Sequence, residues 1–257
     1  LTSTWILYLF NFLFKKKIIV YPHGHAMKIA HLPIKQGRTR YSGKVLMLSF
    51  HKHSTHYWKH LGFKNQHIIG YPKFYPEWKE LISAYAKTLQ KKNKFVLIYS
   101  RSIHEYYMDR DKYAELLISS CKVVQSKLEG IQIIIKPHPR EDIDFIIKLL
   151  DDANINNFSI NYDSSLLYSS SCILVISFWT SAILGALSIN IPAIDYYIEA
   201  NKFRELEPYG SIYKNIGIVA VNNSDDLDKI IGDFDEIKRI NKKVYKNLGS
   251  YSNVQFL

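Results

Sequence analysis

Cysteine is scarce in this chain of 257 residues, which has two, Cys121 and Cys172. Both lie in apolar or helical-looking segments, and neither belongs to a Cys-x-x-Cys pair or to a metal-binding spacing. The sequence therefore predicts structural thiols in a reducing compartment and offers no cysteine-based metal site.

Long apolar runs are also missing. The run from Trp5 to Phe14 is shorter than the ~20 residues that span a bilayer, and no small-residue cleavage site follows it. Three lysines, Lys15 to Lys17, come next. A buried helix on a sheet and a membrane-surface contact with a basic flank both remain open. Because the chain starts at Leu1, we expect a piece of a longer protein whose N-terminal domain is truncated.

Acidic residues are outnumbered, with 23 Asp and Glu against 34 Lys and Arg and a net charge of +11. This excess favours anionic partners, among them nucleotides, phosphorylated acceptors, acidic membrane faces and nucleic acid. The 19 tyrosines and 13 phenylalanines could stack on bases, but the apolar residues have core spacing. No RNA- or DNA-binding motif, internal repeat or low-complexity tract is present, so we expect no nucleic-acid partner.

Apolar segments alternate with amphipathic ones along the chain. The first region predicts strands over 18–21, 45–49 and 67–72 and a helix over 77–90. The polar run 90–94 then predicts a boundary between residues 1–90 and 91–257. The second region predicts strands over 95–99, 131–135, 158–160, 172–176, 191–194 and 218–221. Helices are expected over 112–128, 142–151, 164–170, 181–187 and 225–231, the last capped by Asn223 or Ser224. Strands that alternate with helices predict an α/β fold with a doubly wound parallel sheet.

The loop after Ile135 is the strongest functional candidate. Lys136, His138 and Arg140 follow a β-branched strand and can all donate hydrogen bonds to a phosphate. Pro137 and Pro139 restrict the backbone around the imidazole. The alternative is a solvated loop with a surface histidine. Ligands of α/β enzymes bind just past such strands, which favours a phosphate site.

Polar residues follow other expected strands too. Ser177, Thr180 and Ser181 lead into a helix whose N-terminus could bind phosphate, the alternative being ordinary capping. Arg101 could pair with a diphosphate, and Asp195 with a ribose or sugar hydroxyl. A surface arginine and a solvated aspartate are the corresponding alternatives.

Histidines cluster in the first region. His23 follows the first strand beside Gly24, where an imidazole could act as a general base or merely form a turn. A second set has no carboxylate within it and lies beside Lys52 and Lys59, so we expect a polar helix face and no metal site. This set comprises His51, His53, His56 and His60.

In this order, the segments resemble the CDP-glycerol glycerophosphotransferase family of teichoic-acid polymerases and related capsule-synthesis transferases. The resemblance covers about Lys17 to Ile231. It rests on five short segments: Tyr21 to Lys28 with its His-Gly turn, Gly70-Tyr71-Pro72, Leu97 to Arg101, Lys136-Pro137-His138-Pro139, and Val175 to Tyr197. Ile176 to Ser181 differs from the family's Thr-Asp-Tyr-Ser-Ser stretch in lacking its aspartate, which leaves the donor open.

The resemblance implies a GT-B-like architecture of two Rossmann-like domains, with the second holding a nucleotide donor. By it, His138 would contact the donor diphosphate, Thr180 and Ser181 its phosphates, and His23 would be the base. It implies no metal or redox cofactor.

We therefore expect a cytoplasmic enzyme, peripheral on the inner face of the cell membrane, that moves a sugar or polyol phosphate from a nucleotide-linked donor to a polysaccharide or lipid-linked glycan. The alternatives are a UDP-N-acetylglucosamine 2-epimerase-like enzyme and a non-catalytic basic domain that binds nucleotide or nucleic acid.

Overall fold

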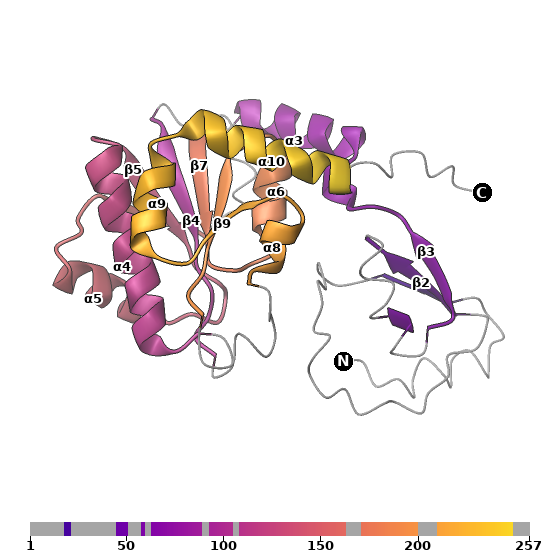
Figure 1. Ribbon diagram of the computed structural model, residues 1–257, viewed down its shortest axis with the longest axis horizontal. Helices are drawn as coiled ribbons and strands as arrows, with labels where there is room; N and C mark the ends of the chain where they lie inside the picture. The colour runs from indigo at the N-terminus through magenta and orange to yellow at the C-terminus, as the bar shows by residue number, and fades with distance from the viewer. Residues whose placement is uncertain are drawn as a thin grey trace. The chain divides into compact units, whose positions relative to one another are not determined.

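The computed structural model describes residues 18–21, 45–50, 58–59, 63–88, 93–104, 108–162, 171–199 and 210–248 (Figure 1). The chain divides into two units after Pro72, and the second unit runs from Lys73 to Asn247. The boundary expected at residue 90 is therefore misplaced. Helix α3 (Pro76–Thr88) groups with the second unit, as does β4 (Phe95–Tyr99).

The first unit contains a parallel sheet of three described strands, β1 (Ile18–Val20), β2 (Val45–Ser49) and β3 (Asn65–Ile68), in that order. Val45 and Met47 of β2 are buried with Phe63 in its core. Strands β1 and β2 confirm the prediction, but β3 begins earlier than expected and ends before Gly70. Gly70 has a φ of 73°, and the 3₁₀ turn η1 (Pro72–Phe74) follows, so the backbone leaves the extended conformation there.

The second unit is built on a six-stranded sheet in which every neighbouring pair is parallel. Its other strands are β5 (Gln132–Lys136), β6 (Phe158–Ile160), β7 (Cys172–Ser177), β8 (Ala193–Tyr196) and β9 (Val219–Val221). The strand order is β6-β5-β4-β7-β8-β9. This is the order of a doubly wound Rossmann sheet, with the reversal of direction between β4 and β7. We call this place the switch point. The predicted doubly wound α/β fold is confirmed.

Helices cover both faces of this sheet. Helix α4 (Arg110–Lys127) contacts α5 (Ile143–Asp152) and α9 (Ser224–Ile231), and the three pack with Val96, Ile98 and their neighbours (Figure 1). The alternate residues of the strands point to the opposite face. There the short, fully buried helix α6 (Ile183–Ser188) packs against β7 and β8, and α8 (Ile212–Asn215) contacts β9. Asn223 caps α9, as predicted, by accepting from the Asp226 N–H at 2.8 Å.

Helix α10 (Phe234–Leu248) was not expected from the sequence. Its charged residues obscure an apolar face on which Ile237 and Val244 are fully buried. Asn241 lies on the same face, and its Oδ1 accepts from the backbone N–H of Ala193 at 2.8 Å, so this helix fixes the start of β8.

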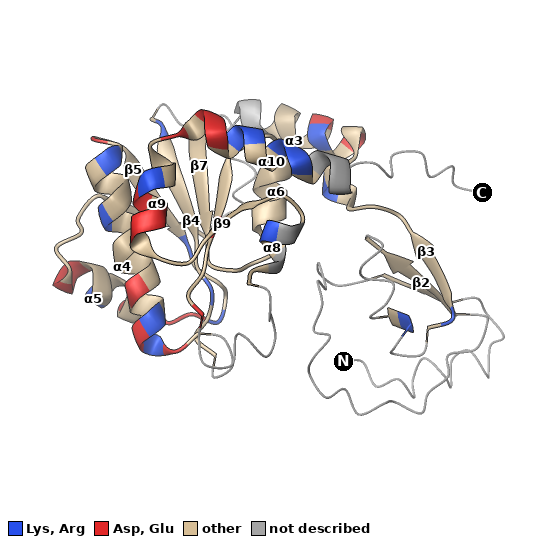
Figure 2. Ribbon diagram, in the orientation of Figure 1, with Lys and Arg blue, Asp and Glu red and all other residues tan. Residues whose placement is uncertain are grey.

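Charges of both signs are interspersed along the helices of the second unit, as Figure 2 shows for α4 and α9. Lys127 of α4 pairs with Asp228 of α9 at 2.9 Å. Among the described residues, no helix is long and apolar enough to cross a membrane. The apolar run from Trp5 to Phe14 and the helix expected over 164–170 lie outside the described residues.

Candidate functional site

The carboxyl ends of four neighbouring strands form the candidate site. Tyr99 at the end of β4 pairs with Lys136 of β5 on one side and with Ser177 of β7 on the other, and Ser177 pairs with Asp195 of β8. The loops that follow these strands therefore leave the sheet side by side, around the switch point. Ligands of open α/β sheets bind in this position.

Backbone hydrogen bonds hold three of these loops together. The Phe178 N–H donates to the carbonyl of Tyr99 at 2.9 Å, and the Ser100 N–H donates to that of Lys136 at 3.3 Å. Below them Phe178 packs edge-to-face against Tyr113 and Tyr196, with ring centroids 6.4 Å apart in both pairs. The loops are thus anchored to the core at their bases.

Arg101 joins the loop after β4 to the loop after β7. Its guanidinium carbon lies 4.5 Å from the centroid of the Trp179 ring, and its Nη1 donates a hydrogen bond to the Trp179 carbonyl oxygen. Trp179 has a φ of 47°, an uncommon conformation for a residue other than glycine. Such backbone conformations persist where surrounding contacts enforce them, and they concentrate at ligand sites.

Asp195 supports this loop from beneath. Its side chain is fully buried; Oδ1 accepts from the Trp179 N–H at 3.0 Å and Oδ2 from the Ser211 hydroxyl at 2.5 Å. Both carboxylate oxygens are therefore engaged inside the protein. This corrects the expectation that Asp195 faces a sugar or ribose hydroxyl, because its position at a strand end is as predicted but its side chain points inward.

His138 lies on the surface of the loop after β5. Its Nδ1 accepts from the backbone N–H of Arg140 at 3.2 Å. Accepting a hydrogen bond assigns the lone pair to Nδ1 and the proton of the neutral ring to Nε2, which makes no hydrogen bond within the described part of the chain. Partial burial and the nearby guanidinium groups of Arg140 and Arg101 lower the pKa of His138. The site therefore presents a neutral N–H donor beside two cations.

Glu141 closes the turn that carries His138. Its backbone N–H donates to the His138 carbonyl at 2.9 Å, and its Oε2 accepts from the His138 N–H and from the Ser100 hydroxyl, the latter at 3.0 Å. Burial raises the pKa of Glu141, although the Tyr113 hydroxyl and the hydrogen bonds from His138 and Ser100 oppose this shift.

Lys136 is directed elsewhere. Its Nζ donates to the carbonyl of Tyr162 at 2.7 Å, in the segment after β6. Strand β6 lies on the side of β5 away from β4, so this contact draws the ammonium away from the switch point. Of the three phosphate-binding candidates in this loop, His138 feels the charges of both Arg140 and Arg101, whereas Lys136 is drawn toward Tyr162.

The start of α6 differs from the open helix end that the sequence suggested. The N–H groups of Ile183, Leu184 and Gly185 donate to the carbonyls of Thr180, Ser181 and Ala182, three residues earlier in each case. Ser177 Oγ donates to the Thr180 carbonyl at 3.3 Å, and Thr180 Oγ1 accepts from the Ala182 N–H at 3.5 Å. The expected backbone donors are thus used within the turn, so any contribution to phosphate binding falls to the half-buried side chains of Thr180 and Ser181.

Some candidates lie outside the described residues: His23, and the set His51, His53, His56 and His60. Within the described ranges, no three His, Cys, Asp or Glu side chains group as a metal site. Trp179, Ser211 and Tyr113 were not recognised from the sequence as parts of the site, and Glu141 was assigned no role. The one signal for Glu141 was its position three residues after His138, the spacing that closes a turn.

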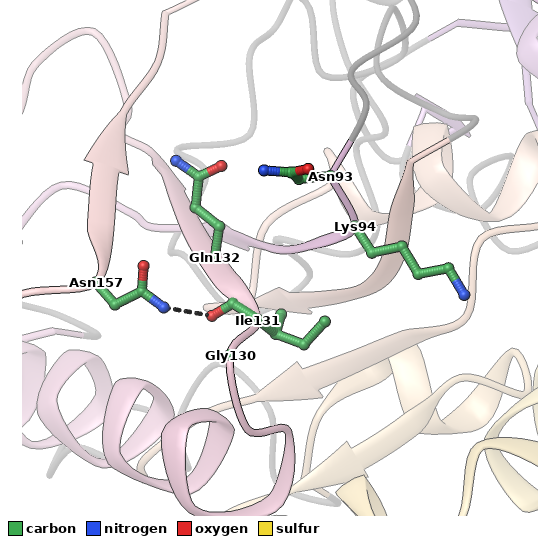
Figure 3. Close-up of a pocket in the computed structure, with 6 residues that line it drawn as sticks. All are labelled: Asn93, Lys94, Gly130, Ile131, Gln132 and Asn157. Atoms are coloured by element: carbon green, nitrogen blue, oxygen red, sulfur yellow. Dashed lines mark hydrogen bonds between the residues drawn. The ribbon is translucent and has the colours of Figure 1, made fainter.

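A hollow lies at the opposite end of the sheet, at the amino ends of β4 and β5 (Figure 3). Asn157 donates to the Ile131 carbonyl at 2.8 Å on its wall. None of the candidate residues lines this hollow, which is formed by Asn93, Lys94, Gly130, Ile131, Gln132 and Asn157.

No protein-family model matches the sequence, and no curated protein matches it. Solved structures match in fold. The wall teichoic acid polymerase TagF aligns with a TM-score of 0.58 and 17% identity over 91% of this chain and 64% of its own. HepE of Anabaena, solved in complex with UDP-glucose, gives a TM-score of 0.52 and 12% identity over 96% of this chain and 73% of its own.

A putative UDP-N-acetylglucosamine 2-epimerase from Listeria monocytogenes gives a TM-score of 0.52 and 11% identity over 81% of this chain and 55% of its own. The chain thus spans less than two thirds of TagF. These likenesses confirm the α/β, GT-B-like fold with Rossmann-type parallel sheets.

Proposed function

We propose that the chain belongs to a GT-B-type transferase that moves a sugar or a polyol phosphate from a nucleotide-activated donor to a surface glycan. The observation that carries this proposal is that the loops after β4 and β5, which carry Arg101, His138 and Arg140, adjoin at the switch point and are joined by the hydrogen bond from Ser100 to Glu141. Two guanidinium groups and an imidazole N–H suit a diphosphate, and the position suits a nucleotide. The fold likeness to TagF and HepE supports the same class of donor.

The mechanism we propose is direct displacement at the donor. The acceptor hydroxyl attacks the transferred group, the bond to the donor phosphate breaks, and the nucleotide leaves with the electron pair. Arg101 and His138 stabilise the negative charge that develops on the leaving phosphate. His23 would take the proton of the hydroxyl, a role that rests on the sequence resemblance alone. We propose that no metal or redox cofactor takes part.

The acceptor and the place of action are part of the same proposal. We propose a polysaccharide or lipid-linked glycan as acceptor and the inner face of the cell membrane as the place where the cytoplasmic protein acts. The net charge of +11 supports contact with an anionic surface.

A thermal-shift panel tests the donor. Because a ligand that binds only the folded protein raises its melting temperature, a matching nucleotide will do so by an amount that grows with the logarithm of its concentration divided by its dissociation constant. The probes are CDP-glycerol, UDP-glucose, UDP-N-acetylglucosamine, CDP, UDP and GDP, with the corresponding nucleosides as controls that lack phosphate. We expect a shift with at least one diphosphate, none with its nucleoside, and loss of the shift in Arg101→Ala and His138→Ala. Equal shifts with diphosphate and nucleoside would sink the proposal.

The second candidate is an epimerase acting on UDP-N-acetylglucosamine, favoured by the fold likeness to the Listeria protein. Incubation with that nucleotide sugar alone distinguishes the two, because an epimerase needs no acceptor. Formation of the 2-epimer without any acceptor would replace the transferase proposal.

A further inference from the structure

Glu141 binds the backbone of His138 on both sides. The N–H of Glu141 donates to the His138 carbonyl at 2.9 Å, and its side-chain Oε2 accepts from the His138 N–H. Glu141 therefore hydrogen-bonds both the N–H and the carbonyl of His138, the backbone groups on either side of the carbon that carries the imidazole. The ring is fixed further by the hydrogen bond from the Arg140 N–H to its Nδ1.

The same carboxylate oxygen connects this turn to the neighbouring loop. Oε2 of Glu141 accepts from the hydroxyl of Ser100, which is buried and directly precedes Arg101 in the chain. Glu141 thus bridges the loop after β5 and the loop after β4. This bridge adds a side-chain contact to the backbone hydrogen bond from Ser100 to Lys136 that joins the same two loops.

The second oxygen of Glu141 faces the core. Oε1 of Glu141 and the phenol oxygen of Tyr113 are both buried, and neither makes a well-formed hydrogen bond among the described residues. Burial and the charge of Glu141 raise the pKa of Tyr113, and the Tyr113 hydroxyl in turn lowers the pKa of Glu141. Tyr113 is held in turn by Phe178 and by Phe145, whose ring centroid is 6.0 Å away.

Stability alone does not explain a carboxyl group here. Burying a charge costs free energy, and a short neutral side chain can close a turn of this kind. A carboxylate, however, accepts several hydrogen bonds at once and can therefore fix two loops in one arrangement.

We propose that Glu141 is a positioning residue that holds His138 and Arg101 at the spacing of a donor diphosphate. This inference rests on the function proposed above. Glu141 does not touch the phosphate; it acts through the backbone of His138 and through Ser100.

Two readouts on the full chain test this role, with Glu141→Ala, Glu141→Gln and the control Glu129→Ala. Glu129 is an exposed glutamate in the turn before β5, at the other end of the same strand. The first readout is the tautomer of His138, measured by ¹⁵N NMR and assigned with His138→Ala. The second is the dissociation constant for UDP and CDP, measured by calorimetry.

In the wild type and in Glu129→Ala we expect the neutral His138 ring to carry its proton on Nε2. Glu141→Ala should mix the two tautomers and weaken nucleotide binding by about tenfold, because buried donors lose their acceptor. Glu141→Gln keeps a side-chain oxygen and should restore binding to within about threefold of the wild type. If Glu141 had a purely structural role, Glu141→Ala and Glu141→Gln would both lose stability, and Glu141→Gln would not restore nucleotide binding.

Wild-type tautomer or wild-type affinity in folded Glu141→Ala would overturn the proposal. If Glu141→Ala does not fold, Ser100→Ala removes one arm of the bridge; about threefold weaker binding supports the proposal, and unchanged affinity overturns it. If the wild type binds neither UDP nor CDP, the proposed function fails. The NMR measurement then still tests the role of Glu141, since an unchanged His138 tautomer in Glu141→Ala would exclude a positioning role.

Discussion

Two arginines of the second unit lie over aromatic rings, and the contrast between them isolates the candidate site. Arg101 stacks on Trp179 at the switch point, whereas Arg110 stacks on Phe145 at 4.1 Å, at the start of α4. Cation–π contacts of this kind contribute comparable free energies. A difference in ligand binding between variants at the two positions therefore reports on the site.

We expect Arg101→Lys to weaken binding of the nucleotide found by the thermal-shift panel by about tenfold or more, because lysine lacks the planar fork that pairs with phosphate. Arg110→Lys should leave that affinity within about twofold while lowering stability by about 0.5–1 kcal/mol. Calorimetry and urea denaturation measure the two effects. Equal losses of affinity in both variants would contradict a role specific to Arg101.

Glu141 gives the protein a characteristic pH dependence. Burial raises the pKa of its carboxyl above the ordinary value of 4.5, so the native state holds this proton more tightly than the unfolded state. The free energy of unfolding therefore falls as the pH rises through the interval above 4.5. His138, whose pKa is lowered, has the opposite effect and is present in both the wild type and Glu141→Gln. Between about pH 4 and about pH 7, the free energy of unfolding of the wild type should thus fall relative to that of Glu141→Gln. Urea denaturation at several pH values measures this difference, and a constant difference would refute the expectation.

For single residues, the sequence predicted which ones lie at the ends of strands but not the directions in which their side chains point. His138, Arg140 and Arg101 were predicted as phosphate-binding residues; the structure places them in the adjoining loops after β4 and β5, and their binding of phosphate stays a prediction. Asp195 and Lys136 were placed correctly at strand ends, yet one carboxylate turns inward and one ammonium turns toward β6. Orientation depends on partners such as Ser211 and Tyr162, which are distant in the sequence and which no local pattern reveals.

At the scale of elements, substitutions at two glycines of the second unit distinguish the cost of backbone strain from the cost of steric crowding. Gly217, between α8 and β9, has a φ of 98°, and a Cβ there would lie 2.6 Å from the Cβ of Lys243 on α10. Gly130 has a φ of 73° with nothing within 4 Å of the same position. We expect Gly130→Ala to cost about 1 kcal/mol from the backbone alone, and Gly217→Ala clearly more, about 2–4 kcal/mol. Urea denaturation compares them, and equal losses would mean that α10 moves aside without cost.

Asp195 joins β8 to two other segments, the loop after β7 and the N-cap of α8, where Ser211 accepts from the Tyr213 N–H at 3.2 Å. Asparagine would offer one acceptor oxygen to two donors. We expect Asp195→Asn to destabilise the fold by about 1–3 kcal/mol and to weaken nucleotide binding through displacement of Trp179.

The control for this change is Asp228→Asn, which removes an exposed ion pair with Lys127 and should cost less than about 1 kcal/mol. Chemical denaturation and calorimetry cover both variants. Unchanged stability in Asp195→Asn would show that the buried carboxylate is dispensable.

Elements were predicted where burial dominates the local sequence. The five-residue strand β4 is buried throughout, and its apolar run has no helical period. Helix α10 was missed because charged residues surround its apolar positions, although Ile237 and Val244 are seven residues apart on one face. The turn at the start of α6 could not be predicted, since its 3₁₀ hydrogen bonds leave no mark on residue type.

At the scale of the whole molecule, the net charge of +11 raises the question of whether the protein binds nucleic acid. In the part of the chain that Figure 2 colours, acidic and basic residues are mixed along α4 and α9. We expect only non-specific binding to duplex and single-stranded DNA and RNA, weaker than about 1 μM and strongly reduced at about 200 mM salt. Fluorescence anisotropy over a salt series measures this. Tight binding that survives high salt would favour the nucleic-acid alternative.

The doubly wound sheet was predictable as a whole because its alternation of strands and helices extends over the second region. The boundary between the units was not, because the polar run 90–94 is locally indistinguishable from a linker. The helix α3 groups with the second unit through its contacts in the folded chain, which the composition around residues 90–94 does not reveal.

Arg101, His138, Arg140, Thr180 and Ser181 occupy segments that begin where the strands stop, at Ser100, Pro137 and Phe178, while the strands themselves carry the buried core. Randomised libraries restricted to these three segments would vary the chemistry of recognition and leave the scaffold intact. The edge of this sheet is thus a natural starting point for directed evolution toward new activated substrates.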